Sequence, residues 1–338
     1  MATDIRLFGA IPDGTTDATA AIQAAVNAGD ILIQDGNYLI SSSIKIPSNR
    51  TVYGKNASLK RADDTYDNFF RNSDFTNGNV NVKIIGQGNF CLDGNSANTY
   101  DNDSTHGLRN DNTHKYFGIV MGNVDGFDIS GVNFIDYTRW NILLHKAING
   151  TVHDLYFNYY NTTKNQDGID ILNGCHDITI YNIYGYTGDD FITFFVGNKP
   201  DFYAPVPDKY VGDIYNISIT NIKTYGTAYH PIIFISGDGN KIHDIAIDYW
   251  VIKSCQFFVY FGLAGYYTAP PSKDDVYNIT FNNITIVAQW DAQAVIKVLN
   301  DCKDITFTNF TNSTGKADYY EAASLSVDNF YINGVNKS

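Results

Sequence analysis

The sequence predicts an all-β fold, a right-handed parallel β-helix with a short N-terminal capping helix. One observation is a dipeptide of Asp or Asn followed by an aliphatic residue, which recurs at intervals of 23 to 39 residues. A second is that each dipeptide opens a run of alternating apolar and polar residues, the pattern of a strand with one buried face. A third is the lack of helical segments between the runs, together with few two-residue Asn-Gly or Asp-Gly turns. This favours stacked parallel strands over a sandwich of hairpins. The dipeptides are Asp128-Ile129, Asp154-Leu155, Asp177-Ile178, Asn216-Ile217, Asp244-Ile245, Asn278-Ile279 and Asp304-Ile305.

The N-terminal segment, about residues 8–28, predicts the capping helix. Thr16 or Asp17 is a suitable N-cap, and Ile22, Ala25 and Val26 fall on one face of the helix. Such a helix would cover the unpaired strand edges of the first turn of the coil. Residues 29–335 are then the rungs, and the whole chain, 1–338, is expected to be a single β-helix domain.

The longest repeat intervals predict inserted loops. Residues 198–211 and 262–275 separate repeats by more than one bare turn of a coil needs. Both segments contain tyrosines that could line a groove and stack on sugar rings.

Composition narrows the class of protein. The chain is 44% hydrophobic and carries a net charge of −13, which disfavours nucleic acid or an anionic membrane surface as a partner. Its four cysteines show no Cys-x-x-Cys spacing and are expected to be buried free thiols, with no metal and no cofactor. The first residues lack the pattern of a secretory signal, and no apolar run is long enough to span a membrane.

Two acidic strings carry the strongest indication of chemistry. Asp167 precedes the pair Asp189-Asp190 by 22 and 23 residues, about one turn of the predicted coil. One turn would therefore stack three carboxyl groups on neighbouring rungs. Hydrolysis of a glycosidic bond needs such a cluster, because one carboxyl protonates the leaving oxygen while another activates water or attacks. Asp167 and Asp170 could instead be turn residues that close a rung.

Consecutive strand residues point to opposite faces, so Asp189 and Asp190 can share a face only where the strand bends. Gly188 makes a bend at that point plausible.

Several motifs resemble those of the pectate-lyase superfamily, which includes polygalacturonases and bacteriophage tail-spike depolymerases. Residues 9–25 read Gly-Ala-x-x-Asp-Gly-x-x-Asp-x-Thr-x-Ala-Ile-Gln-Ala-Ala, very like the opening of these proteins. The string 165–167, Asn-Gln-Asp, resembles the polygalacturonase Asn-Thr-Asp, and 188–190 matches its Gly-Asp-Asp. His230 stands where the family has Gly-His-Gly, with both glycines replaced.

The resemblance implies an inverting glycoside hydrolase. Asp189 would protonate the glycosidic oxygen, Asp167 and Asp190 would hold and deprotonate water, and His230 would lie beside the acid. Where the family has Arg-Ile-Lys to hold a sugar carboxylate, residues 257–261 read Phe-Phe-Val-Tyr-Phe. The loss of both cations indicates a neutral or modified polysaccharide in place of galacturonan.

Further residues are candidates for binding the sugar chain. The aromatic replacements suggest Phe258 and Tyr260, which would suit apolar sugar faces. The other substrate-binding candidates are Asn165, Lys164 and Arg139, the last of which lies upstream of the acidic rung.

Two alternatives to a hydrolase stay open. A β-eliminating lyase on the same fold would need a uronate, usually a calcium ion, and a basic residue as proton acceptor. A non-catalytic carbohydrate-binding phage tail adhesin is the other. The resemblance to phage tail proteins also implies a homotrimer, and action outside the cell or on a virion.

Overall fold

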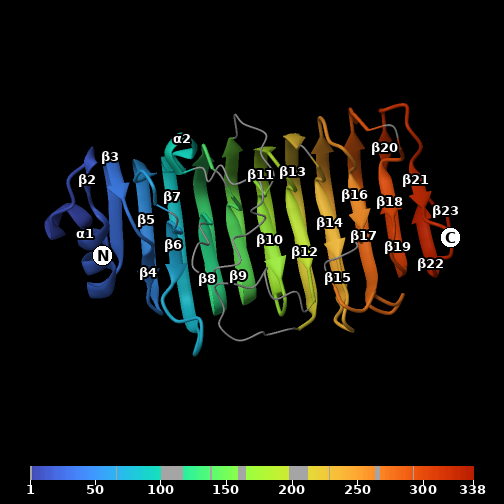
Figure 1. Ribbon diagram of the computed structural model, residues 1–338, viewed down its shortest axis with the longest axis horizontal. Helices are drawn as coiled ribbons and strands as arrows, with labels where there is room; N and C mark the ends of the chain where they lie inside the picture. The colour runs from blue at the N-terminus through green and yellow to red at the C-terminus, as the bar shows by residue number, and fades with distance from the viewer. Residues whose placement is uncertain are drawn as a thin grey trace.

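The protein is a long coil of parallel strands in a computed structural model. The structure describes residues 2–65, 67–99, 117–137, 139–158, 165–197, 212–227, 229–262, 267–291 and 293–338. Figure 1 shows the strands following one another along the long axis, with the two termini at opposite ends. The prediction of an all-β parallel coil is confirmed.

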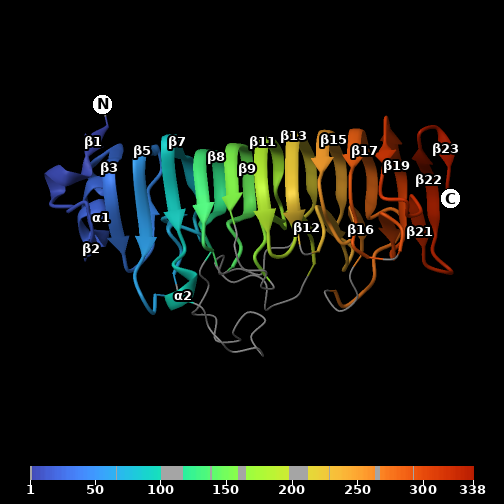
Figure 2. The same cartoon turned by 90° about the horizontal axis from the view of Figure 1, so that it is seen from above.

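Each full turn of the coil contributes to two series of strands. The longer strands pair in parallel from β3 to β22, which lie side by side in Figure 2. The shorter strands form a second parallel series, in which the first residues of β8 and β9 take part. The first series comprises β3 (Ile31–Ile40), β5 (Arg50–Arg61), β7 (Asn79–Asp93), β8 (Ile119–Ile135), β9 (Ile142–Asn158), β11 (His176–Thr187), β13 (Ile214–Thr227), β15 (Ile242–Ile252), β17 (Val276–Ile286), β19 (Cys302–Thr308) and β22 (Val327–Ile332). The second comprises β4 (Ile44–Ile46), β6 (Phe70–Asn72), β10 (Ile169–Leu172), β12 (Ile192–Phe195), β14 (Ile232–Ile235), β16 (Val259–Phe261), β18 (Ile296–Val298) and β21 (Tyr319–Glu321).

The remaining elements are short. The N-terminal end holds β1 (Thr3–Asp4), the 3-10 helix η1 (Ile5–Phe8), β2 (Asp13–Asp17) and α1 (Thr19–Ala28), and a one-turn helix α2 (Ser96–Thr99) follows β7. Towards the C-terminus, β20 (Thr311–Asn312) pairs with β17, and β23 (Val335–Asn336) folds back antiparallel onto β22. Within the described ranges, no helix is long and apolar enough to cross a membrane.

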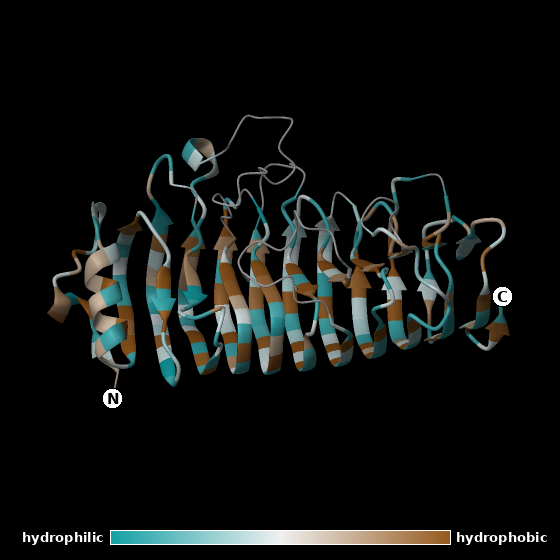
Figure 3. Cartoon of the chain, turned by 60° about the horizontal axis from the view of Figure 1, so that its bottom comes forward, coloured by the Kyte–Doolittle hydropathy of each residue, from teal (hydrophilic) through white to brown (hydrophobic). Residues whose placement is uncertain are grey.

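The interior of the coil is filled by the apolar residues of the alternating runs. In β11, Ile178, Ile180 and Ile183 are buried in one continuous core, while Thr179 is exposed. Figure 3 shows the resulting alternation of hydrophobic and hydrophilic bands along the strands. The four cysteines are buried free thiols, as predicted, and burial raises the pKa of Cys175 to about 12.

The long strands bend at Asp and Asn residues with a left-handed backbone. Asp177 (φ 57°) is in register with Asn216 (φ 52°) and Asp244 (φ 55°), and the series continues with Asn278, Asp304 and Asn329. Asp and Asn tolerate this conformation better than other residues with a side chain. The side chains also bond from rung to rung, as in Asn329 Nδ2 donating to Asp304 Oδ1 over 2.8 Å. The recurring dipeptide is therefore a requirement of the bend.

Two of the seven predicted repeat positions are wrong in register. The equivalents of Asp177 in the two preceding rungs are Asn149 (φ 54°) and Gly126 (φ 79°), in place of Asp154 and Asp128. Most rungs contain a second left-handed position five residues later, which Asp154 occupies, while Asp128 lies in the paired part of β8 at neither position. A search for the dipeptide alone cannot distinguish the two positions.

Helix α1 lies at the N-terminal end of the coil (Figure 1). Its apolar face, Ile22, Ala25 and Val26, is fully buried, as predicted. The predicted N-cap is displaced by one residue, since Ala18 precedes the helix, and Asp17 Oδ1 accepts the bond from the Thr19 N–H at 2.9 Å. The Gln23 amide bonds both backbone groups of Lys45 in β4, at 2.8 and 2.9 Å. These are groups that another rung would otherwise bond.

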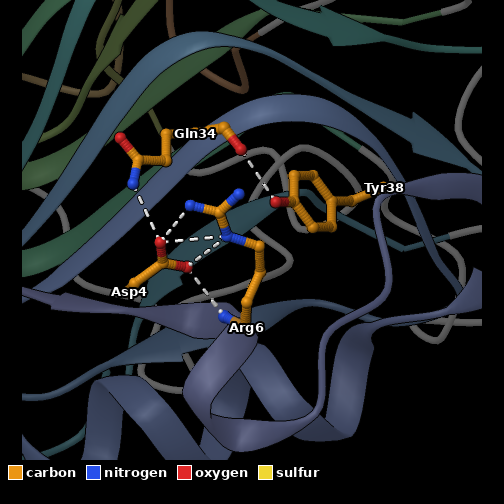
Figure 4. Close-up of polar contacts among 4 residues, drawn as sticks. All are labelled: Asp4, Arg6, Gln34 and Tyr38. Atoms are coloured by element: carbon orange, nitrogen blue, oxygen red, sulfur yellow. Dashed lines mark hydrogen bonds and ion pairs between the residues drawn. The ribbon is translucent and has the colours of Figure 1, made fainter.

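A polar cluster fastens the first strand beside this helix (Figure 4). The Asp4 carboxylate accepts bonds from Nε of Arg6 at 3.0 Å and from Nε2 of Gln34 at 2.8 Å, while the hydroxyl of Tyr38 donates to the Gln34 carbonyl. The bond from the Arg6 guanidinium lowers the pKa of Asp4 to about 2. Asp4 is therefore ionised throughout the usual pH range, and β1 stays bonded to the first rung.

The capping role of α1 remains a prediction that one pair of variants tests. Ile22→Asp would place an unpaired charge in the end of the core, and we expect it to lower the free energy of unfolding by about 3 kcal/mol. It should also expose the edge of β4, so that oligomers form. Ala24→Asp adds the same charge on the exposed face of the helix and should do neither. Thermal unfolding measures the loss of stability, and size-exclusion chromatography measures the oligomers. If Ile22→Asp and Ala24→Asp behave alike, α1 does not cap the coil.

The bend residues can be tested at Asn221, which is exposed, has φ 55°, and donates to Asn182 Oδ1 at 2.6 Å. Both Asn221→Gly and Asn221→Ala remove the side-chain bond. Glycine has no Cβ and fits the left-handed region, whereas alanine keeps a Cβ there without the local hydrogen bonding of asparagine, at a cost of roughly 1–2 kcal/mol. We expect the alanine variant to be the less stable one in denaturant titrations. An alanine variant as stable as the glycine variant would show that backbone strain does not explain the repeat.

Candidate active site

The acidic strings and His230 lie at one corner of the coil, where the chain passes from a long strand to a short one. Asp167, Asp190 and His230 each stand two residues before a short strand, β10, β12 and β14 respectively. Backbone bonds hold these corners in register, from Gly168 N to Asp190 O at 2.9 Å and from Phe191 N to His230 O at 2.8 Å. The three side chains therefore occupy the same position on successive rungs.

Two sets of outward positions describe the site. The corner column is Asp167, Asp190, His230 and Phe257, the residues two places before β10, β12, β14 and β16. The strand column is Asp170, Thr193, Ile233, Tyr260 and Lys297, which are directly in register on β10, β12, β14, β16 and β18.

Asp189 and Asp190 lie in the corner itself, because β11 ends at Thr187 and β12 begins at Ile192. The strict alternation of a strand does not apply there, and the backbone bends at Gly188, as predicted. The hydroxyls of Thr187 and Thr227 both donate to the Asp189 carbonyl, and so fix the turn. Consecutive carboxyl groups can thus both serve one site.

Asp189 is held from the neighbouring rung. Its Oδ2 accepts a bond from the backbone N–H of Asn165 at 2.6 Å. Asn165 has a left-handed backbone, with φ 62°, a conformation that Asn adopts readily. The predicted site residue Asn165 is therefore next to the acidic pair, and its observed contact is made by the main chain.

His230 contacts Asp190. Its Nδ1 lies 2.6 Å from Asp190 Oδ1, and its backbone N–H donates to the same oxygen at 3.1 Å. Both side chains are largely buried, with 10% and 14% of their surfaces exposed. The resemblance implied that His230 lies beside Asp189, which shares this corner; the contact seen for the imidazole is with Asp190, because His230 and Asp190 share the corner column.

Asp167 and Asp170 form a buried acidic pair below this turn. Asp167 is 6% exposed and Asp170 is fully buried. Burial raises the pKa of both carboxyls well above the usual range, and the negative charges of Asp189 and Asp190 raise both further. The close contact between Asp167 and Asp170 also raises the pKa of Asp167. The pair therefore keeps its protons to a higher pH than exposed aspartates do.

Asp170 is a site residue that the sequence prediction left among the turn residues. It lies within β10, where Ile169 and Ile171 face the core, so its carboxyl faces outward toward the acidic turn. The feature of the sequence that could have identified Asp170 as a site residue is its position three residues after Asp167. In a strand preceded by a corner, that spacing places both side chains on the outer face.

Gly168 allows the rungs to approach closely at this point. A Cβ at this residue would lie 2.3 Å from the Phe191 carbonyl oxygen and 3.0 Å from the ring of Phe157. No other residue fits between Asp167 and β10 without shifting the rungs apart. The glycine is thus part of the geometry that stacks the carboxyls.

An aromatic group continues both columns beyond His230. The imidazole ring lies 4.8 Å from the ring of Tyr260 and 5.9 Å from that of Phe257. Tyr260 is 9% exposed, so most of its ring packs within an outer apolar cluster that includes Ile233. The structure brings the predicted residue Tyr260 to the site.

The prediction that Phe258 binds substrate is wrong. Its side chain is fully buried in the interior core, against Trp250, Phe281 and Phe310. The reason is the corner before β16: Phe258 and Val259 both face the core, so strict alternation does not hold there, while Phe257 and Tyr260 lie in the outer apolar cluster. The prediction placed the aromatic segment 257–261 at the site correctly, but it assigned Phe258 to the wrong face of the strand.

The other predicted residues lie around this corner or outside the described ranges. Arg139 is partly exposed and belongs to the rung before Asp167, where Asn141 Nδ2 donates to the Asp167 carbonyl at 2.7 Å. Gln166 is buried, and its amide donates to the Tyr137 carbonyl at 2.6 Å, so it fixes the strand before Asp167. Lys164 and the predicted loop 198–211 lie outside the described residues, as does part of the loop 262–275.

Comparison with protein families supports the resemblance on which several of these predictions depend. The model of the family described as glycosyl hydrolases family 28 matches residues 18–232, which include the whole acidic cluster. The predicted resemblance to polygalacturonase-type β-helix proteins is confirmed.

Individual relatives are phage proteins and enzymes of the same fold. A pre-neck appendage protein of Bacillus phage B103 is 33% identical over 99 residues, which are 27% of this chain; the chain spans only 11% of that protein's length. A family 28 exopolygalacturonase of Yersinia enterocolitica has a TM-score of 0.69 at 16% identity, covering 99% of this chain and 79% of the other. A hyperthermoactive exopolygalacturonase of Thermotoga maritima has a TM-score of 0.66 at 16% identity, covering 99% and 92%. At these identities the two structures show a shared fold.

The buried pair Asp167–Asp170 predicts a particular dependence of stability on pH. Because the folded state raises the pKa of Asp170, it stabilises the protonated form, and this stability is lost as the pH rises through the raised pKa. Asp170→Asn cannot ionise, so it should unfold at a higher temperature than the wild type at alkaline pH, by about 2 °C or more. At acidic pH the two should be alike.

Thermal unfolding followed by circular dichroism from pH 4 to pH 9 measures this difference. Asp35→Asn, at an exposed position, is the matched control and should follow the wild type at every pH. A constant offset between Asp170→Asn and the wild type would contradict the burial of a titrating pair.

Proposed function

The chain belongs to the glycosyl hydrolases family 28, and on this premise we propose that it hydrolyses the glycosidic bonds of a polysaccharide. The observation that carries the proposal is the stacking of Asp167, Asp190 and His230 on successive rungs, with Asp189 at the same corner. This cluster lies within the part of the chain that the family model matches.

In the proposed reaction, water displaces the leaving sugar in a single step with inversion. Asp189 protonates the glycosidic oxygen as the bond breaks. Asp167 and Asp190 hold the water and remove its proton as it attacks the anomeric carbon from the opposite side. The bond from carbon to the leaving oxygen breaks as the bond to water forms; Asp189 gives its proton to the leaving oxygen, and the base takes one proton from the water.

His230 acts through Asp190 in this scheme. With Nδ1 2.6 Å from Asp190 Oδ1, the imidazole orients the carboxyl that is proposed to activate water. The raised pKa of Asp167 makes it the second candidate for the proton donor, and the choice between Asp167 and Asp189 is open to experiment.

The substrate is proposed to be a neutral or modified polysaccharide. Tyr260 takes an outward place next to His230, where the resemblance led us to expect the cations that hold a sugar carboxylate. An aromatic ring packs against the apolar face of a sugar and offers no charge to a uronate.

The setting of the activity is proposed to be a virion, where depolymerisation would open a path through a surface polysaccharide. Support comes from the 33% identity to the pre-neck appendage protein of Bacillus phage B103. The homotrimer remains a prediction, which sedimentation equilibrium would test.

The proposal predicts that the wild type releases reducing ends from a polysaccharide and that Asp189→Asn does not. We expect a loss of about 10²–10⁴-fold, the usual contribution of a general acid. The assay is colorimetric, on a panel of neutral, carboxylated and sulfated polymers. Asp35→Asn should retain full activity.

Three other outcomes would redirect the proposal. A product that absorbs in the ultraviolet, formed only with calcium, would indicate a lyase. Binding of a polymer without any product would indicate an adhesin. Finally, an aryl glycoside of the released sugar needs no protonation to depart, so it should restore much of the activity of Asp189→Asn and little of Asp190→Asn; restoration for Asp167→Asn instead would make Asp167 the acid.

A further inference from the structure

Lys297 continues the strand column beyond Tyr260 and was not among the predicted residues. It lies on β18 in direct register with Tyr260 on β16, as the last member of the strand column. Its neighbours Ile296 and Val298 are fully buried in the core. Alternation along the strand therefore directs the Lys297 side chain outward, on the same face as Asp170 and Tyr260.

The ammonium group of Lys297 rests on the aromatic rings that surround His230. Its Nζ lies 4.6 Å from the centroid of the Phe257 ring and 5.6 Å from that of Tyr260. Both rings contact the imidazole of His230. Attraction between the cation and the two ring faces holds the ammonium over Phe257 and Tyr260.

No carboxylate neutralises Lys297 among the described residues. Lys273 and Lys303, by contrast, are paired with Asp328 and Asp274 at 2.5 and 2.6 Å. In the next rung, the residue in register is Tyr320, which is 44% exposed. Glu321 is one residue further along that strand, and so faces the other side, where the Tyr319 hydroxyl bonds it at 2.6 Å.

We propose that Lys297 and Tyr320 form a subsite for a sugar residue that carries an anionic substituent, a carboxylate or a sulfate. The ammonium binds the substituent, and the exposed ring of Tyr320 packs against the face of the sugar. The backbone of Lys297 lies two rungs beyond His230, roughly 10 Å along the coil, and its ammonium lies over the aromatic rings of the rung between them. It rests on the proposed function, because it names the substrate class of the same site.

The position of Lys297 indicates which modification the proposed substrate carries, namely an anionic substituent on some of its sugars. The corner next to His230 is aromatic, so the sugar that is cleaved needs no charge. The cation lies further along, so the charge belongs to a neighbouring sugar of the chain. A polymer with alternating or occasional acidic units fits this pattern better than a polymer in which every sugar is acidic.

The test compares Lys297→Met with the wild type, because methionine keeps an unbranched apolar stem over the rings and removes only the charge. Lys297→Arg should retain function, and Lys253→Met, at an exposed position, is the control for loss of one charge. Substrates are a carboxylated polymer, the same polymer with its carboxyls reduced to alcohols, and a sulfated polymer.

We expect Lys297→Met to raise KM for the anionic polymer roughly tenfold with little change in kcat, as loss of one charge-assisted contact predicts. The wild-type KM should rise with salt, and this rise should be weaker in Lys297→Met. The reduced polymer should not distinguish the variants. Whether the carboxylated or the sulfated polymer shows the effect identifies the substituent.

Binding separates this inference from the proposed hydrolysis. Calorimetry with Asp189→Asn and anionic oligosaccharides measures the subsite whether or not the wild type cuts the polymer. Weaker binding when Lys297→Met is added supports the subsite even if no reducing ends are ever released. The inference is overturned if Lys297→Met binds and cleaves the anionic polymer as the wild type does, if the wild type prefers the reduced polymer, or if no anionic oligosaccharide binds.

Discussion

The backbone hydrogen bonds between successive rungs are the interaction on which the rest of this structure depends. Parallel pairing keeps a residue directly above its counterpart, at about 4.8 Å, over the length of the coil. Side chains that are 22 to 40 residues apart in the chain therefore become neighbours. Asp167, Asp190 and His230 are close for this reason, and so are Tyr260 and Lys297 in the adjacent column.

The same stacking imposes an electrostatic cost on the acidic residues. Carboxyl groups at rung spacing and away from water cannot all ionise at low cost, so Asp167 and Asp170 keep their protons to a higher pH than exposed aspartates do. A glycoside hydrolase requires one carboxyl that donates a proton close to another that accepts one. The chemistry thus follows from burial and register, with no cofactor needed in the proposed scheme.

The corner of the coil lets two consecutive carboxyl groups lie on the outside of the protein, which a regular strand would not allow. Asp189 and Asp190 are consecutive, and within a strand one of them would point into the core. Two threonine hydroxyls, from Thr187 and Thr227, fix the turn through the Asp189 carbonyl, and the Asn165 N–H holds its carboxylate. Beyond the corner, the strand column changes from acidic at Asp170 to aromatic at Tyr260 and cationic at Lys297. A sugar chain lying along the coil would meet the aromatic and then the cationic side chain, whereas Asp170 is buried beneath the corner.

The sequence by itself determined the coil and most of the acidic site. Alternating runs bury one face, Asp and Asn supply the bends, and one-turn spacing joins Asp167 to Asp189 and Asp190, all of which are local or periodic properties. The tertiary structure decided which residues face outward: it placed Phe258 in the core, made Asp190 the partner of His230, and added Asp170 and Lys297. Whether a side chain faces the core or the outside depends on the residue at which each corner ends and each strand begins. A shift of this boundary by one residue turns every side chain of the strand to the opposite face. That boundary is set by the rungs on either side, which a motif within one rung does not contain.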